Sequence, residues 1–283
     1  MSTYFCPGHV TCFFQPVRTR DIRSTGSRGA GLRLNLGSRV TLAERDDGEV
    51  NITMDGVPSE APVTRCMLRH AAPGRGFDVT VDNDLPVGQG FGMSASGAIA
   101  AAMCVCELLG KSEEDAFLLA HQAEVEQGGG LGDVAAIQCL GHQPVRVDPG
   151  MSPYGKVVST QLEFDSLTLA VIGGELSTAS VINDSVMQRK LAEAGSKAVD
   201  EFLSDPTTDN LFRLSRRFSR EIGMETSRMK EILDVLNEKG RAGMCMLGHS
   251  IFTDVPAEKV TEMFEDVEVF ECSTYGGPVT RTE

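Results

Sequence analysis

The stretch Leu85-Pro86-Val87-Gly88-Gln89-Gly90-Phe91-Gly92-Met93-Ser94-Ala95-Ser96-Gly97 carries the most information about the fold. Its glycines recur at alternate positions, and the apolar segment 98–109 follows directly. Because glycine adopts positive φ at little cost, such a run lets several backbone N–H groups point toward one spot. A helix predicted over 96–109 would direct its first amides and its positive dipole end there too. Loop and helix together predict an anion site, with a nucleotide phosphate as the expected occupant.

Two better-known phosphate-binding motifs do not fit this loop. No Gly-Lys-Ser/Thr follows the glycines, so the loop is not of the Walker A type. Gly90, Gly92 and Ala95 match the relaxed dinucleotide-binding fingerprint, but residues 82–86 separate them from the strand predicted over 77–81. A glycine-rich surface turn without any ligand is the remaining alternative.

A second informative segment is the helix predicted over 113–127. Phe117, His121 and Glu124 share one face of it at helical spacing, and a carboxylate on an apolar face needs a partner because burying it alone is costly. A glycine-rich run then ends the helix and places Asp133 at the start of the next apolar segment. Glu124 as a salt-bridged core acid and Asp133 as a plain N-cap are the structural alternatives.

The composition indicates a soluble cytoplasmic enzyme. The 283 residues are 41% hydrophobic, and 26 basic against 40 acidic residues give a net charge of −14, which argues against nucleic acid and anionic membranes as partners. No apolar run is long enough to span a membrane, and no basic, apolar signal segment is found. The eight cysteines contain no Cys-x-x-Cys pair and fit a reducing compartment. A homodimer is compatible with these features, but the sequence does not give the oligomeric state.

The pattern of short strands and helices predicts an α/β chain of the α+β kind. Strands are predicted over 31–36, 39–44, 49–54, 77–81, 144–147, 167–172, 243–247, 250–253 and 267–270. Helices are predicted over 96–109, 113–127, 133–140, 179–194, 196–203, 208–222 and 226–238, and after Pro256. A junction is expected within 150–165, which divides the chain into domains 1–160 and 161–283.

These motifs resemble the small-molecule kinase superfamily of galactokinase, homoserine kinase, mevalonate kinase and phosphomevalonate kinase, the GHMP kinases. That family has a P-x-x-x-G-L-x-S-S-A loop, then a glutamate on a helix, then G-x-x-D. Here Phe91 replaces the usual leucine and Met93 replaces the first serine. Within the superfamily the chain is most similar to archaeal kinases of pantoate, on the residues Cys6-Pro7-Gly8-His9-Val10-Thr11-Cys12-Phe13-Phe14 and Gly26-Ser27-Arg28-Gly29-Ala30-Gly31. His9 stands where mevalonate kinases have lysine, and the C-terminal glycine motif is reduced to 243–248.

The resemblance implies a fold and an activity. The fold would be an N-terminal domain like the second domain of ribosomal protein S5, followed by a ferredoxin-like domain. The activity would be ATP-dependent phosphorylation of pantoate on the route to coenzyme A. Ser94 and Glu124 would hold Mg²⁺, and Asp133 would accept or orient the proton of the substrate hydroxyl. ATP contacts are implied for Pro86, Gly88, Gln89, Gly90, Phe91, Gly92, Met93, Ser94, Ala95 and Ser96.

The substrate carboxylate calls for an arginine, because its planar fork donates two parallel hydrogen bonds. Arg146 is the first candidate and Arg28 the second. Further candidates for substrate contacts are Ser27, His121, Thr178 and His9. Each of the last three has a structural alternative: a satisfied core histidine for His121, a helix cap for Thr178, and a role at a strand end for His9.

Three alternative functions fit parts of the sequence. A sibling kinase would act on homoserine, mevalonate or shikimate with the same machinery, and a substrate panel distinguishes it. A ligand sensor on the same fold is disfavoured because Ser94, Glu124 and Asp133 are all present. An oxidoreductase that uses a dinucleotide is disfavoured by the loop spacing and would bind nicotinamide.

Overall fold

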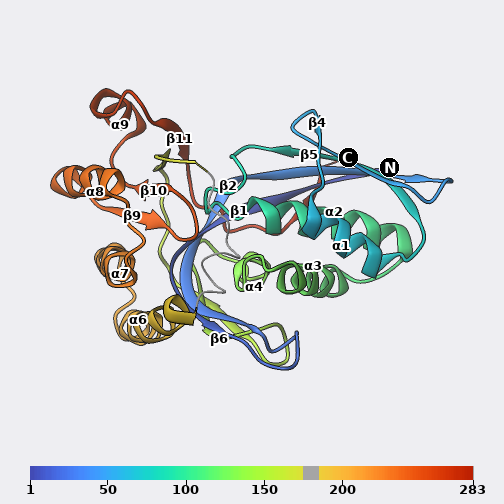
Figure 1. The fold of residues 1–283 in the computed structure, drawn as a ribbon, viewed down its shortest axis with the longest axis horizontal. Helices are drawn as coiled ribbons and strands as arrows, with labels where there is room; N and C mark the ends of the chain where they lie inside the picture. The colour runs from blue at the N-terminus through green and yellow to red at the C-terminus, as the bar shows by residue number, and fades with distance from the viewer. Residues whose placement is uncertain (175–184, 283) are drawn as a thin grey trace.

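The computed structural model describes residues 1–174 and 185–282 as two antiparallel-rich sheets with helices packed against them (Figure 1). The first sheet contains β1 (Ser2–Val17), β2 (Gly26–Arg45), β3 (Val50–Met54), β4 (Val57–Pro58), β5 (Gly76–Asn83), β6 (Pro144–Asp148), β7 (Lys156–Ser159) and β12 (Thr280–Arg281). Its order is β12-β1-β2-β5-β3-β4, with β6 pairing with β2 and β7. Among these pairs only β3 and β5 run parallel, within the part of the chain that is described.

The second sheet has the order β11-β8-β10-β9. It consists of β8 (Leu167–Val171), β9 (Ala242–Cys245), β10 (Ser250–Thr253) and β11 (Glu268–Cys272). Numbered within this half of the chain, the order is 4-1-3-2 and every pairing is antiparallel, with helices after the first and third strands. This is the ferredoxin-like arrangement that the resemblance implied.

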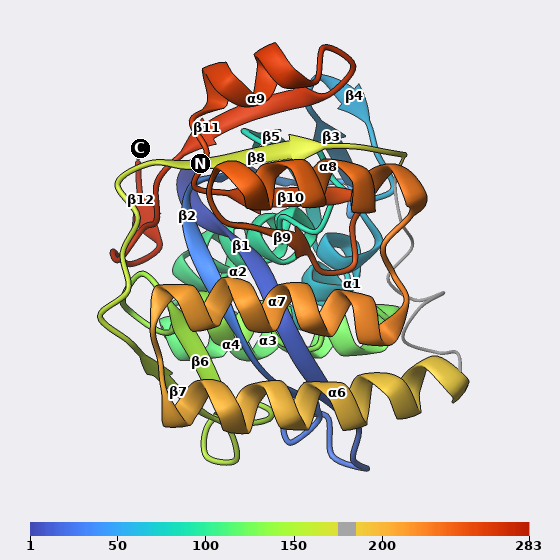
Figure 2. The same cartoon turned by 90° about the vertical axis from the view of Figure 1, so that its left-hand side faces the viewer.

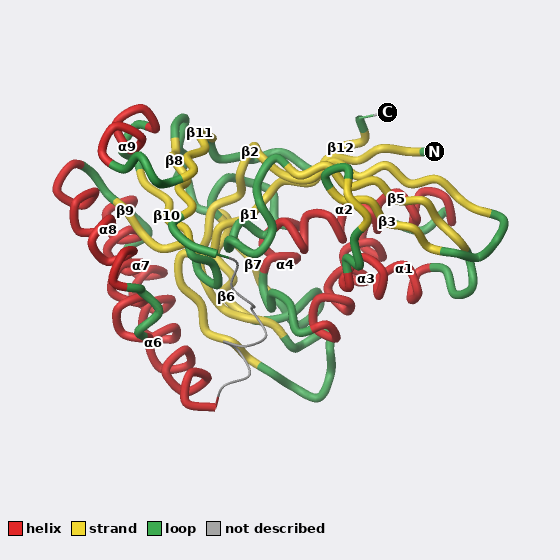
Figure 3. Tube along the Cα trace, turned by 45° about the horizontal axis from the view of Figure 1, so that its top comes forward, coloured by secondary structure: helices red, strands yellow, loops and turns green. Residues whose placement is uncertain are grey.

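Helices pack against both sheets, and β1 and β2 are contacted by helices from both halves of the chain. The first sheet carries α1 (Pro62–Ala71), α2 (Met93–Leu109), α3 (Glu113–Gln127) and α4 (Asp133–Gln138), and the second half contributes α6 (Ser185–Ser204), α7 (Thr208–Ile222), α8 (Ser227–Lys239) and α9 (Ala257–Met263). Figure 2 shows α6, α7 and α8 side by side, with β1 and β2 behind them, and Figure 3 shows the strands in yellow between α6–α9 and α1–α4 in red. No helix of the described residues is both long and apolar enough to cross a bilayer.

Two hydrophobic cores share the same two strands. Cys6 and Val40 belong to the core around α2, whereas Val10, Phe13 and Leu32 belong to the core under α6 and α7. The strands β1 and β2 therefore run from one core into the other. The domain division at 160/161 stays a prediction.

Several element boundaries differ from those predicted. The strands predicted over 31–36 and 39–44 are one strand, β2, because Gly37 is a point of close approach and not a turn: a Cβ there would lie 2.0 Å from the Cys6 carbonyl oxygen. The predicted break between the helices 179–194 and 196–203 is also wrong, because Gly195 lies inside α6. A Cβ there would lie 2.1 Å from the carbonyl oxygen of Phe14, so this glycine lets the helix contact β1. The start of the helix predicted over 179–194 lies outside the described residues. The strands β1, β4, β7 and β12 and the helix α1 were not predicted.

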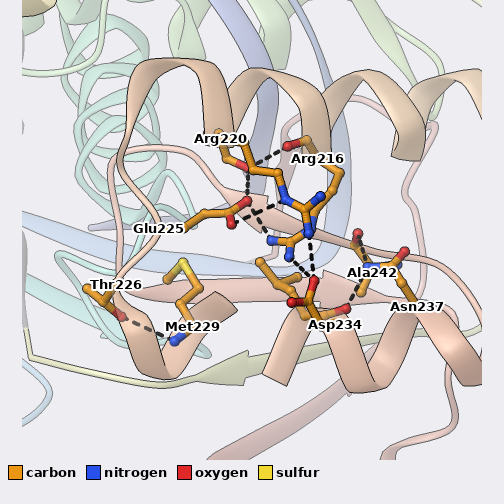
Figure 4. Close-up of polar contacts among 10 residues, drawn as sticks. Arg216, Arg220, Glu225, Thr226, Met229, Asp234, Asn237 and Ala242 are labelled. Atoms are coloured by element: carbon orange, nitrogen blue, oxygen red, sulfur yellow. Dashed lines mark hydrogen bonds and ion pairs between the residues drawn. The ribbon is translucent and has the colours of Figure 1, made fainter. Parts of the chain in front are cut away.

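An ion-pair cluster joins α7 to α8 (Figure 4). Arg216, only 8% exposed, pairs with Glu225 at 2.5 Å and with Asp234 at 2.6 Å. Arg220 shares Asp234 at 2.6 Å. The Thr226 hydroxyl accepts from the backbone of the third residue of α8 and caps that helix. Because every charge has an opposite neighbour, this cluster holds α7 and α8 together.

Candidate active site

The glycine-rich loop has the geometry that the sequence predicts. Gly88, Gly90 and Gly92 all have positive φ, at 78°, 77° and 71°. A Cβ on Gly90 would lie 2.7 Å from the Met246 carbonyl oxygen, so the loop is held tightly against the turn between β9 and β10. Gly92 precedes α2 and offers no side chain to cap it, which leaves the amides of the first turn available for an anion.

A cavity of about 200 Å³ lies beside this loop. It collects side chains from β1, β2, β6, α2, α3 and the segment before α4, all brought together by the fold. Its lining residues are Thr11, Phe14, Ser27, Val87, Gly88, Gly90, Phe91, Gly92, Met93, Ser94, Ala95, Glu124, Gly129, Gly130, Leu131, Gly132, Asp133, Arg146, Met246 and Leu247. The three ionisable residues of this set are Glu124, Asp133 and Arg146. Anion-binding amides, two carboxylates and one guanidinium therefore surround a single space.

Ser94 and Glu124 meet at one wall of the cavity. The Ser94 hydroxyl donates to Glu124 Oε1 at 2.8 Å, and the Gly130 amide donates to Oε2 at 2.6 Å. Glu124 is 1% exposed. Burial, and secondarily the charge of Asp133, raise the pKa of Glu124 to about 7, although both hydrogen bonds oppose the shift. A buried carboxylate whose partners among the described residues are a hydroxyl and an amide, without a cation, suits a hard divalent metal ion.

Asp133 is held by a buried histidine. His9 Nδ1 lies 2.7 Å from Asp133 Oδ1, and His9 has no exposed surface. Burial lowers the pKa of His9 despite the opposing effect of Asp133. Burial acts to raise the pKa of Asp133, but the hydrogen bond from His9 and the charge of Arg146 oppose it, and the net shift is downward. Asp133 is thus an ionised acceptor, and a neutral His9 donates through Nδ1.

The backbone around His9 is adapted to this contact. The pairing of β1 with β2 shifts register between Pro7 and His9, as at a β-bulge, a feature that re-aims side chains. The other ring nitrogen of His9 points at Gly31, where a Cβ would lie 2.2 Å from it. Glycine at this position makes room for the imidazole, which the sequence pattern alone did not reveal.

Arg146 is the cation of the cavity. It is 1% exposed, and its Nε, Nη1 and Nη2 atoms have no hydrogen-bond partner among the described residues. Burial lowers the pKa of Arg146, but a guanidinium stays protonated at any ordinary pH. Gly29 and Gly132 give it space, since a Cβ on either would approach a guanidinium nitrogen to 2.4 or 2.5 Å. A buried, charged fork without a partner is expected to bind an anionic ligand.

The other predicted substrate residues are placed differently. Ser27 lines the cavity. Arg28 does not: its guanidinium donates to the Val147 carbonyl at 2.8 Å and to Asp200 at 2.6 Å. His121 is buried away from the cavity and bonds the Ile22 carbonyl through Nε2 at 3.0 Å. Thr178 lies outside the described residues.

Three of the predicted ATP-binding residues do not line the cavity. The amide of Gln89 donates to the Gly173 carbonyl at 3.0 Å. The Ser96 hydroxyl donates to the Cys6 carbonyl at 2.7 Å, which fixes the start of α2 on the sheet. Pro86 precedes the glycines without touching the cavity. The remaining seven predicted loop residues do line it.

Sequence reasoning assigned no role to part of the apolar wall. Thr11 and Phe14 reach the cavity from β1, Leu131 from the glycine run, and Met246 and Leu247 from the turn after β9. Leu247 has a φ of 65°, in the left-handed region. Thr11 and Phe14 are three residues apart and would face opposite sides of a regular strand, but the pairing of β1 with β2 shifts register between Thr11 and Phe13. No local signal in the sequence predicted β1 or this irregularity.

A second hollow, of about 240 Å³, adjoins the phosphate loop. It shares Val87, Met93 and Ser94 with the first cavity, and its other wall is the segment 59–64 at the start of α1. The start of α2 therefore separates this mostly apolar hollow from the cavity that contains Arg146.

The family comparisons agree with this geometry. Residues 61–141 match the GHMP kinases N terminal domain. The chain is 33% identical to a pantoate kinase of Thermococcus kodakarensis, with 94% of this chain and 92% of that protein covered. It is 30% identical to a pantoate kinase of Methanocaldococcus jannaschii, with 88% and 90% covered.

Solved structures give the same result. A phosphotransferase related to the coenzyme A biosynthesis pathway superposes with a TM-score of 0.88 at 29% identity, covering 99% of this chain and 98% of that one. A mevalonate kinase superposes with a TM-score of 0.67 at 17% identity over 97% and 99%, which supports the fold alone. Both the sequence resemblance and the predicted fold class are confirmed, and the chain belongs to the pantoate kinase family of the GHMP kinases.

Proposed function

We propose that this protein transfers the γ-phosphoryl group of ATP to the 4-hydroxyl group of pantoate. The observation that carries the proposal is Arg146, a fully buried guanidinium whose three nitrogens have no partner among the described residues, in the cavity that also contains Asp133. A substrate with both a carboxylate and a hydroxyl group satisfies the two residues at once. The names of the relatives, pantoate kinases, identify such a substrate.

The acceptor end of the cavity matches the parts of pantoate. The carboxylate of pantoate binds Arg146 through charge-assisted hydrogen bonds. Ser27 lines the same cavity and contacts the 2-hydroxyl group. Phe14, Leu131 and Leu247 supply an apolar surface for the two methyl groups. Homoserine would place a charged ammonium group in this region, where burial without a partner is costly.

The donor end holds ATP and its metal ion. The amides of the loop and of the first turn of α2 bind the phosphates, and the apolar hollow beside α1 takes the base. Ser94 and Glu124 would hold Mg²⁺, which fits the raised pKa of a buried carboxylate without a cation. When bound, Mg²⁺ neutralises phosphate charge during transfer.

Asp133 provides the base. It lies at the start of α4 with a fifth of its side chain exposed, and His9 fixes its orientation. As the bond forms between the pantoate 4-oxygen and the γ-phosphorus, the bond from that phosphorus to the β-phosphate bridging oxygen breaks and ADP leaves. The hydroxyl proton passes to Asp133, whose lowered pKa keeps it ionised and ready to accept.

The test is ADP release with ATP and Mg²⁺ when pantoate, homoserine, mevalonate and shikimate are offered at equal concentrations. We expect kcat/KM for pantoate to exceed that for each other acceptor by at least about tenfold, a difference of roughly 1.4 kcal/mol in transition-state binding. Equal or faster turnover of another acceptor would assign the chain to a sibling activity. ADP release that does not depend on any acceptor would contradict the proposal altogether.

A further inference from the structure

Three different metal-binding side chains converge between α1 and α3, away from the active-site cavity. Cys66 and His70 lie one turn apart on α1, and Glu126 lies near the end of α3. Their ligand atoms all fall within 4.8 Å of one another. Cys66 is 2% exposed, whereas the side chains of His70 and Glu126 are 36% and 31% exposed. The cluster is therefore closed on the protein side by a thiol and open to solvent on the other.

We propose that Cys66, His70 and Glu126 form a binding site for a divalent transition-metal ion of the Zn²⁺ type. A thiolate, an imidazole nitrogen and a carboxylate oxygen are the three ligand classes that Zn²⁺ takes in proteins. Mg²⁺ prefers oxygen ligands throughout and does not suit this set. The site is thus chemically distinct from the Ser94–Glu124 pair.

The distances are close to those that a metal ion requires. Glu126 Oε2 lies 2.7 Å from His70 Nε2 and 3.4 Å from Cys66 Sγ. Metal–ligand bonds of about 2.0–2.3 Å in a tetrahedron separate the ligand atoms by roughly 3.3–3.7 Å. His70, which lies on the exposed side, must move outward from Glu126 to reach this spacing. The fourth tetrahedral position faces solvent and can be filled by water.

The carboxylate is already oriented for this role. Gln122, one turn before Glu126 on α3, donates to Oε1 at 2.8 Å and leaves Oε2 directed at the other two ligands. Supporting hydrogen bonds of this kind fix metal ligands in place. Oε2 accepts from the thiol and contacts the imidazole, so a metal ion would take the place of the shared hydrogen atoms. The thiol proton is released, and the imidazole proton is held on Nδ1.

A metal ion bound at this site is expected to cross-link α1 and α3. The start of α1 lines the hollow beside the phosphate loop, and α3 carries Glu124. A metal ion that binds only the folded chain raises its stability in proportion to its concentration over Kd. The site is expected to act on stability, because none of its ligands lines the active-site cavity.

The experiment uses the full chain freed of metal and titrated with Co²⁺ and Zn²⁺ in the presence of excess Mg²⁺. We expect thiolate-to-Co²⁺ charge-transfer absorption at one equivalent, bleached by Zn²⁺, and a rise in Tm with Zn²⁺. Cys66→Ser should abolish the absorption. His70→Asn and Glu126→Gln, on exposed side chains, should weaken Zn²⁺ binding at least about tenfold while kcat stays at the wild-type value.

Two control variants make the result decisive. Cys139→Ser removes a cysteine that lies outside the cluster and is more exposed than Cys66, and this variant should keep the absorption. Glu124→Gln disables the proposed Mg²⁺ site and should keep it as well, so this site and the proposed function can fail separately. No absorption in the wild type, or wild-type Zn²⁺ affinity in both His70→Asn and Glu126→Gln, would overturn the proposal.

Discussion

Arg146 and Arg216 are both buried arginines, yet their surroundings are opposite. Arg216 lies between α7 and α8 with Glu225 and Asp234 in ion-pair contact (Figure 4). Arg146 lies in the cavity, and its three guanidinium nitrogens have no hydrogen-bond partner among the described residues. The acid that lines the cavity beside it, Asp133, bonds His9 instead. One arginine is paired by acids of the protein, and the other has no hydrogen-bond partner among the described residues, which is why we propose that it binds an anion.

This difference distinguishes a structural charge from a functional one. A buried ion pair that loses one partner strands the other charge, so the cost falls on stability. A buried charge without a partner already destabilises the ligand-free protein, and the cost is recovered on binding. The following variants test that distinction.

The largest effect is expected for Asp133→Asn. Asparagine keeps the size and can accept from His9, but it cannot take a proton, and a positioned base supplies on the order of 10²–10⁴ in rate. We expect kcat to fall by that factor while ATP binding and Tm stay near wild type. The measurement is kcat beside nucleotide titration and thermal melting.

Asp148→Asn, an exposed change at the end of β6, is the matched control and should leave kcat unchanged. The N-cap of α4 is Gly132 and not Asp133, so the capping alternative for Asp133 is wrong. If Asp133→Asn melts early, the contact of Asp133 with His9 serves mainly the fold. If it keeps more than about a tenth of the wild-type kcat, Asp133 is not the base.

Arg216→Met should affect stability and not catalysis. It leaves Glu225, whose side chain is 5% exposed, without its nearest cation, and we expect a loss of about 3 kcal/mol in the free energy of unfolding. The folded fraction should keep wild-type KM values for both substrates. Chemical denaturation with parallel kinetics measures both. As a control, Arg220→Met removes a half-exposed partner of the same Asp234 and should cost less than about 1 kcal/mol in the free energy of unfolding. Equal losses for the two variants would show that the burial of Arg216 does not make its ion pairs more important for stability.

Arg146→Met should weaken the binding of pantoate and leave stability unchanged, the opposite of what we expect for Arg216→Met. Losing a charge-assisted hydrogen bond costs about 1.5–3 kcal/mol, so KM for pantoate should rise roughly tenfold to a hundredfold with KM for ATP nearly constant. Stability should not fall, because an unpaired buried charge is removed. Since Arg146 helps to lower the pKa of Asp133, the acid limb of the kcat/KM profile should move to higher pH.

Arg28→Met is the control for this prediction, because Arg28 lies on the neighbouring strand but bonds Val147 and Asp200. It should leave KM for pantoate unchanged. A shift in KM for ATP with Arg146→Met would instead place that guanidinium on the nucleotide.

The smallest effect concerns Glu124, a second buried charge without an ion-pair partner. Its pKa of about 7 lies above the ordinary 4.5, so the folded state holds a proton that the unfolded state loses as pH rises between these values. Stability from this group therefore falls over that range. Glu124→Gln escapes the loss and should be more stable than wild type above pH 7, by on the order of 1–3 kcal/mol, with the difference fading toward pH 4.5.

Melting curves between pH 5 and 8 test this, with the exposed Glu114→Gln as the control. The same Glu124→Gln variant, and Ser94→Ala, should need more Mg²⁺ for half-maximal rate. An unchanged Mg²⁺ dependence in both would remove them from the metal site, and a pH-independent stability difference would contradict the raised pKa.

The glycine loop and the helix α3 could be predicted from the sequence, because the residues that determine them are neighbours in the chain. Glycines at alternate positions predicted the left-handed loop, and α3 begins and ends at the predicted residues because a capping box and a glycine mark its ends. The choice between Arg28 and Arg146 could not be decided in this way. Gly29 pairs with Arg146 across the sheet, and the missing side chain at Gly29 admits the guanidinium, whereas Arg28, one residue away, faces the other side.

The same limit explains the missed strands. Gly31 and Gly37 lie within β2 to admit His9 and the backbone at Cys6, which are distant in sequence. A local pattern cannot distinguish a glycine that turns the chain from one that makes room for a neighbour, so β2 was divided and β1 was overlooked.

The strands β1 and β2, 16 and 20 residues long, extend from one hydrophobic core into the other, with two register shifts along their pairing. Because both strands contribute side chains to both cores, the two halves are expected to behave as one frame and not as bodies joined by a linker. The glycine segments 88–92 and 129–132 border the cavity on either side of Glu124, and Gly90 and Gly92 lie in close backbone contact with Met246 and His9. Glycine at this site therefore permits close packing and a left-handed backbone, so the amides that face the cavity are expected to be in position before a substrate binds.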